Sequence, residues 1–118
     1  MLQNELYTVV EIGGNTATIR LLAESAIYQA HFPGNPITPG MCQVGIVGEL
    51  LETMRGRRLE LREVKNLKFM EVLKPGFVSD VVITFDKMEE DDARLAVKGT
   101  FVSESRTYTK FSLVFEMI

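Results

Sequence analysis

The 118-residue chain contains one cysteine and one histidine, and it has no excess of positive charge. A single cysteine cannot form a disulfide within the chain, which fits a reducing compartment. The net charge is -3 at pH 7, so the composition gives no reason to expect a nucleic-acid partner. No apolar run is long enough to span a bilayer, and the N-terminal sequence lacks the basic segment and apolar core of a signal peptide. We therefore expect a cytoplasmic protein that does not insert into membranes.

The sequence also lacks internal repeats, low-complexity tracts and linkers, so its length predicts one domain, residues 1–118. No cluster of His, Cys, Asp and Glu has the spacing of metal ligands. The acidic run Glu89–Asp92 is typical of a solvated turn rather than of a metal site. We therefore expect no bound metal.

The rarest residues gather in one stretch, His31–Leu51, which holds the only histidine, the only cysteine and three of the four prolines. Prolines fix φ and disfavour helix in the residue before them, so the first part is expected to be a rigid loop. The apolar run that follows predicts a helix with Thr38 as its N-cap, Pro39 at its first position and Gly56 just past its end. Because this helix is apolar nearly all round, we expect it to be buried.

Segments rich in alternating or β-branched residues predict about six strands. They cover Glu5–Ile12, Thr16–Leu22, Leu59–Met70, Phe77–Asp86, Leu95–Val102 and Thr107–Met117. A bulge is expected near Val64–Asn66, and Ala26–Ala30 is expected to be a short extended piece before His31. Most strands follow the helix, which favours an antiparallel α+β fold over a βαβ array. One sheet around one helix leaves a free edge strand, so we expect it to pair with a second copy.

The sequence HFPGNPITPGM at His31–Met41 resembles the signature of the 3-hydroxyacyl-[acyl-carrier-protein] dehydratases, a hotdog-fold family of fatty acid biosynthesis. The matching residues are His31, Phe32, Pro33, Pro36, Pro39 and Gly40. A second block, NLKFMEVLKPG at Asn66–Gly76, resembles the strand of that family that ends in a Pro-Gly turn. The resemblance covers nearly the whole chain. It implies a hotdog fold in which an antiparallel sheet of about six strands wraps around one long central helix.

The resemblance also implies a mechanism, the elimination of water from a 3-hydroxyacyl thioester. His31 would act as the general base, oriented by the backbone carbonyl of Ile37. The backbone N–H of Gly40, at the positive end of the helix dipole, would receive the negative charge that develops on the thioester carbonyl. Met41 and Gly45 are candidates for lining or widening an acyl tunnel. No resident cofactor is implied, because the substrate is carried on the phosphopantetheine of acyl carrier protein or of CoA.

One catalytic residue of the family has no counterpart at its expected place. The family has a Glu or Asp fourteen residues after the histidine, contributed from the partner subunit, and this position is Gly45 here. Glu49 lies four residues later on the same helix face and is our candidate for the missing acid. An ordinary helix carboxylate, exposed or paired, explains Glu49 equally well. Cys42 is expected to be a small buried hydrophobe rather than a nucleophile.

Three functions therefore remain open. The chain is a dehydratase in which another group replaces the acid, or a hotdog acyl thioesterase, or a catalytically incomplete subunit whose partner supplies the acid in a hetero-oligomer. The expected partners are acyl carrier protein and a second copy, with the active site at the subunit interface. Candidates for a basic carrier-binding patch include Arg57 and Arg58, although scattered solubilising charges explain them equally well.

Overall fold

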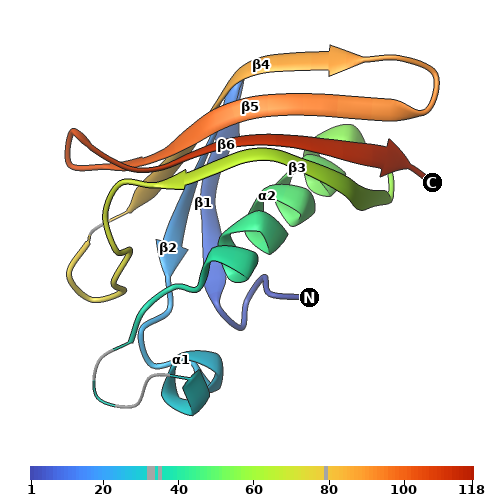
Figure 1. Cartoon of the computed structure of the whole chain (residues 1–118). Helices are drawn as coiled ribbons and strands as arrows, with labels where there is room; N and C mark the ends of the chain where they lie inside the picture. The colour runs from blue at the N-terminus through green and yellow to red at the C-terminus, as the bar shows by residue number, and fades with distance from the viewer. Residues whose placement is uncertain (32–33, 35, 79) are drawn as a thin grey trace.

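The computed structural model describes residues 1–31, 34, 36–78 and 80–118, and the side chain of His31 lies outside the described part. Within that part, six strands and two helices follow one another (Figure 1). They are β1 (Tyr7–Gly13), β2 (Thr16–Leu21), α1 (Ala26–His31), α2 (Gly40–Arg55), β3 (Leu59–Phe69), β4 (Val81–Glu90), β5 (Arg94–Ser103) and β6 (Arg106–Met117).

The strands form one antiparallel sheet in the order β1-β2-β4-β5-β6-β3. Figure 1 shows α2 lying along one face of this curved sheet, with the short α1 beyond the start of α2. The arrangement is the hotdog architecture that the sequence predicts. No helix in the described ranges is both long and apolar enough to cross a membrane.

The core lies between α2 and the sheet. Alternate residues of the central strands, such as Ile83, Phe101 and Phe111, point toward the helix and are buried. The helix buries one face only: Val47 and Leu50 are inaccessible, whereas Met41 on the other side is 69% exposed. The expectation of a helix buried nearly all round is therefore wrong. Its outer face carries two glycines and a methionine, which made the sequence look uniformly apolar.

The segment before His31 also differs from its prediction, because Ala26–His31 is the helix α1 rather than an extended piece. Ser25 starts this helix: its hydroxyl accepts from the N–H of Ile27 at 3.2 Å, and its carbonyl accepts from the N–H of Gln29 at 3.1 Å. A serine at this position satisfies N–H groups that the first turn leaves open.

The start of α2 is shifted by one residue from its prediction. Pro39 is the N-cap, with φ -61° and ψ 151°, and Gly40 is the first helical residue. Thr38 does not cap the helix, because its hydroxyl bonds Tyr28 instead. The predicted end is confirmed: Gly56 adopts a left-handed conformation with φ 65°, and its N–H donates to the Glu52 carbonyl.

Strand β4 begins four residues later than the predicted start at Phe77. Gly76 has φ 89° and the N–H of Phe77 donates to the Lys74 carbonyl, so Phe77 belongs to the turn. Pairing with β2 begins only at Val81, opposite Ile19. A register shift after Phe85 then carries β4 through to Glu90, so Glu89 and Glu90 of the acidic run are strand, whereas Asp91 and Asp92 lie in the turn after it. The bulge predicted in β3 near Val64–Asn66 is confirmed.

Candidate active site

The start of α2 leaves backbone N–H groups without intrahelical partners. Within the described residues, no side chain caps this end and no acidic residue lies in its first turn. The first regular helix bond runs from the N–H of Gln43 to the Pro39 carbonyl. The N–H groups of Gly40, Met41 and Cys42 precede it and have no carbonyl partner within the helix. These groups carry the positive end of the helix dipole. The predicted oxyanion position, Gly40, therefore lies where a negatively charged oxygen is stabilised.

A cavity of about 370 Å³ opens at this helix start. Its walls come from the segment before α2, from the first turn of α2 and from the end of β3 with the residues after it. They are Ile37, Thr38, Pro39, Gly40, Gln43, Phe69, Met70, Glu71, Val72 and Leu73. Two of the predicted substrate-binding residues, Ile37 and Gly40, thus share one cavity.

The Phe69 ring covers Gly40. A Cβ atom added at Gly40 would lie 2.5 Å from Cζ of Phe69, closer than any real contact. Glycine is therefore needed at this position for the aromatic ring and the helix start to approach each other. The ring is half-exposed, so it forms a movable wall of the cavity rather than part of the core.

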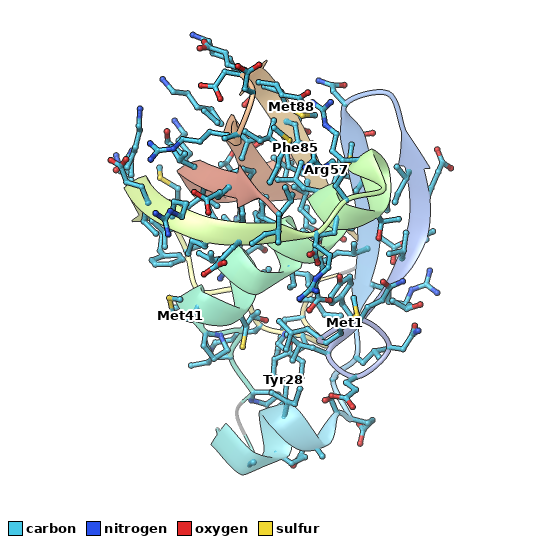
Figure 2. All side chains as sticks on the ribbon, turned by 90° about the vertical axis from the view of Figure 1, so that its right-hand side faces the viewer. Met1, Tyr28, Met41, Arg57, Phe85 and Met88 are labelled. Carbon is cyan, nitrogen blue, oxygen red and sulfur yellow. The ribbon has the colours of Figure 1, made fainter. Side chains whose placement is uncertain are left out.

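The other predicted site residues lie along the outer face of α2. Met41, Gly45 and Glu49 line a second cavity of about 260 Å³, together with Leu61 of β3 and Phe115 of β6. Figure 2 shows Met41 on the outer side of α2. The structure thus separates the predicted residues into a group at the helix start and a group on the exposed helix face. His31 ends α1, and the placement of its imidazole lies outside the described residues.

Glu49 is bound by the N-terminal segment of the chain. One carboxylate oxygen accepts from the backbone N–H of Leu2 at 2.6 Å. The other accepts from the N–H of Gln3 at 2.9 Å and from the Tyr7 hydroxyl at 3.0 Å. Burial, the charge of Glu49 and this hydrogen bond together hold the pKa of Tyr7 well above its usual value. A proton donated by Glu49 would have to sit on an oxygen that already accepts a hydrogen bond.

The same N-terminal segment fills the place of the missing acid. A Cβ atom at Gly45 would lie 2.9 Å from Cδ1 of Leu2. The Leu2 side chain therefore occupies the space into which a longer residue at position 45 would extend. Gly45 and Glu49 together form the surface of α2 on which this N-terminal segment packs.

A cluster of buried polar side chains lies at the cavity at the start of α2, where Thr38 and Gln43 form part of the wall. The Tyr28 and Thr38 hydroxyls bond each other at 2.8 Å, and the Gln43 amide donates to the Thr38 carbonyl at 3.1 Å. The Thr109 hydroxyl donates to the Gln43 side-chain oxygen. Burial raises the pKa of Tyr28 to about 12. This cluster was not predicted from the sequence, although a glutamine within an apolar helix was a signal for it.

Cys42 lies beside the helix start but is not an activated thiol. Burial raises its pKa, which favours the neutral thiol over the reactive thiolate at neutral pH. The expected lack of a nucleophilic role agrees with this direction, but Cys42 is half-buried at the edge of the core rather than buried as predicted.

Comparison with known proteins connects the fold to a family. A family model described as ApeI dehydratase matches residues 11–108. The 3-hydroxyacyl-[acyl-carrier-protein] dehydratase FabZ of Latilactobacillus sakei is 38% identical over 72 residues, which is 55% of this chain and 51% of that protein. FabZ of Rickettsia bellii is 25% identical over 113 residues, 83% of this chain and 78% of that protein. The chain spans about half the length of the first of these relatives.

Solved structures share the fold at low identity. The dehydratase heterocomplex ApeI:P from Xenorhabdus doucetiae matches with a TM-score of 0.65 and 18% identity, over 92% of this chain and 96% of that one. The thioesterase HI1161 from Haemophilus influenzae matches with a TM-score of 0.64 and 13% identity, over 97% of this chain and 80% of that one.

Proposed function

Because the chain belongs to the ApeI-like dehydratase family, we propose that it eliminates water from 3-hydroxyacyl thioesters to give 2-enoyl thioesters. The observation that carries this proposal is the uncapped start of α2, where Gly40, the last matching residue of the histidine motif, lines a cavity. The names of the FabZ relatives, which are 3-hydroxyacyl-[acyl-carrier-protein] dehydratases, support the same chemistry.

In the proposed reaction, His31 removes the proton from the carbon next to the thioester carbonyl. Negative charge moves onto the carbonyl oxygen, which accepts hydrogen bonds from Gly40 and its neighbours at the helix start. The bond between the 3-carbon and its hydroxyl oxygen then breaks, and the hydroxyl leaves as water after taking up a proton. The Ile37 carbonyl is the proposed acceptor for the other imidazole N–H.

The proton for the leaving hydroxyl has two candidate sources. Glu49 stays a candidate, but it would have to be released by Leu2, Gln3 and Tyr7 before it could carry and donate a proton. The alternative is an acid from another subunit. The complex of ApeI with a second protein, described as a dehydratase heterocomplex, supports that alternative for this fold.

The surface of the chain supports an oligomer in either case. The outer edge of β3 has no partner strand among the described residues. The adjacent outer face of α2 carries the exposed Met41 and the second cavity. A strand edge next to an apolar groove is typical of a surface that pairs with another chain. We propose that a second hotdog subunit, identical or related, covers this surface.

We propose that the acyl group arrives on the phosphopantetheine of acyl carrier protein or of CoA. The basic candidates Arg57 and Arg58 lie just past the end of α2, and a helix of 16 residues is about 24 Å long. They are therefore remote from Gly40 of their own chain. Reversing the charge of both arginines tests whether they bind acyl carrier protein. An unchanged affinity for the carrier protein would exclude them from its binding surface.

A second function, thioester hydrolysis, is favoured by one observation: position 45 holds no carboxylate and is covered by Leu2. A site with a base and an oxyanion donor but no acid suits the attack of water on a thioester better than dehydration. The thioesterase HI1161, which shares this fold, shows that the fold accommodates thioesterases.

The test is to incubate the purified protein separately with 3-hydroxyacyl and saturated acyl thioesters of acyl carrier protein. Formation of the 2-enoyl thioester supports dehydration, whereas release of free thiol from the saturated substrate supports hydrolysis. Neither product from the chain alone, with enoyl product after a candidate partner subunit is added, supports the incomplete-subunit alternative. Variant Glu11→Gln, which changes an exposed carboxylate on β1, serves as the control.

A further inference from the structure

Four polar side chains are buried together at the cavity at the start of α2, and two of them, Thr38 and Gln43, form part of its wall. Tyr28 and Thr109 are inaccessible, and Thr38 and Gln43 are each 3% exposed. They come from α1, from the segment before α2, from the first turn of α2 and from β6. Figure 2 shows Tyr28 between α1 and the rest of the fold. The hydrogen bonds between them join four separate elements into one network.

Each polar atom of Thr38 forms a hydrogen bond. Its hydroxyl bonds Tyr28, its carbonyl accepts from Gln43, and its N–H donates to the Leu73 carbonyl at 2.8 Å. Thr38 lies two residues before Gly40, so the orientation of its peptide groups sets the direction in which α2 begins. The Tyr28–Thr38 bond also ties together two residues on either side of His31 in the sequence.

Packing alone does not require these polar groups. Phenylalanine and valine have nearly the same shapes as tyrosine and threonine, and burying a hydroxyl has a desolvation cost that only its hydrogen bond offsets. A buried network in which every group is satisfied selects one arrangement over others of similar packing. In the sequence, Thr38 of this network lies between the candidate base, His31, and the candidate oxyanion donor, Gly40, so a single arrangement of this segment matters for catalysis.

Building on the proposed function, we propose that Tyr28, Thr38 and Gln43 are positioning residues that fix the start of α2 relative to the segment carrying His31. They do not touch the reacting atoms. Their hydroxyl and amide groups keep the oxyanion donor and the base in one mutual geometry.

The test compares Tyr28→Phe and Thr38→Val, which remove one hydroxyl each, with Thr38→Ser, which keeps it. We expect kcat for dehydration to fall about tenfold or more in the first two variants, with KM within about twofold. Thr38→Ser should retain most of the wild-type kcat. The double variant Tyr28→Phe/Thr38→Val should be no slower than the slower single variant, because the two hydroxyls act as one unit. Thr84→Val, on β4, is the matched control.

A second readout does not depend on activity. His31 is the only histidine, so its ring protons give unique NMR signals. We expect these signals to shift or broaden in Tyr28→Phe and Thr38→Val but not in Thr38→Ser or Thr84→Val. Unchanged signals in the first two variants, or an equal change in Thr38→Ser, would overturn the positioning role. A wild-type protein that dehydrates nothing but shows the expected NMR pattern contradicts the proposed function and leaves the positioning role supported.

Discussion

Replacing Glu49 separates a structural role of this carboxylate from a catalytic one. The carboxylate accepts hydrogen bonds from Leu2, Gln3 and Tyr7, and it links α2 to residues more than forty positions earlier in the chain. Glu49→Ala removes all three bonds. Glu49→Gln keeps one oxygen acceptor and places an amide NH₂ where the other oxygen accepted from an N–H.

The size of the effect follows from the surroundings of each donor. The Tyr7 side chain is buried, so leaving its hydroxyl without a partner would cost about 1–3 kcal/mol of folding free energy. The Leu2 and Gln3 amides lie near the surface and can form hydrogen bonds with water instead. We therefore expect Glu49→Ala to lower the free energy of unfolding by about 3 kcal/mol and Glu49→Gln by about 1–2 kcal/mol. Tyr7→Phe should lower it by about 1 kcal/mol, and Tyr7→Phe combined with Glu49→Ala by less than the sum.

Urea unfolding followed by circular dichroism measures these free energies, with Glu11→Gln as the control. Hydrogen exchange of the Leu2 and Gln3 amides should also become faster in both Glu49 variants. If Glu49→Ala unfolds at the same urea concentration as the wild type, the structural assignment fails. A Glu49→Gln protein that loses stability as expected but keeps full turnover removes Glu49 from the catalytic mechanism.

Three further predictions use other contacts. Gly99→Ala places a Cβ against the Thr84 carbonyl oxygen and the Phe111 ring, so it should lower the free energy of unfolding by more than about 3 kcal/mol or prevent folding, as judged by urea unfolding. Gly40→Ala should raise the KM for the thioester in steady-state assays but leave the free energy of unfolding in urea nearly unchanged. The half-exposed Phe69 ring can move away from the added Cβ atom, and in doing so it narrows the cavity. The pKa of Tyr28 is raised to about 12 in the folded state, above the value of 10 for an exposed tyrosine. The neutral Tyr28 hydroxyl therefore contributes to the free energy of unfolding fully below pH 10, and this contribution is lost as pH rises from 10 through 12. Tyr7, whose pKa is also raised, adds to the total loss, so the part due to Tyr28 is the difference between wild type and Tyr28→Phe in urea titrations at successive pH values. This difference should be about 2–3 kcal/mol.

Sequence patterns predicted most of the fold because its elements are long and amphipathic. The alternation in β3, β5 and β6 and the run of apolar residues in α2 match the observed elements closely. The end of α2 was predictable as well, since Gly56 takes the left-handed conformation that glycine adopts readily. Signals of this kind depend on neighbouring residues and need no knowledge of the tertiary structure.

The errors occur where contacts from distant residues decide the local structure. The α1 segment is too short for a helical period to emerge, and its cap at Ser25 was overlooked. Thr38 has the chemistry of an N-cap, but Tyr28 supplies a partner for its hydroxyl that no local pattern reveals. Strand β4 starts where pairing with β2 becomes available rather than where β-branched residues begin.

The candidate site was predicted in part. The motif identified Gly40 and Ile37, and both line the cavity at the helix start. The contact of the N-terminal segment with Gly45 and Glu49 could not be predicted, because it joins residues far apart in the sequence. The role of His31 stays a prediction that rests on the motif.

We propose that His31 and the amide groups at the start of α2 form a site for activated acyl groups. The most direct test measures enoyl thioester formation from a 3-hydroxyacyl thioester by the wild type and by His31→Ala, together with any subunit that the wild type requires. We expect product with the wild type and a loss of at least about a hundredfold in the variant, the usual contribution of a general base. Equal rates for the two proteins would contradict it.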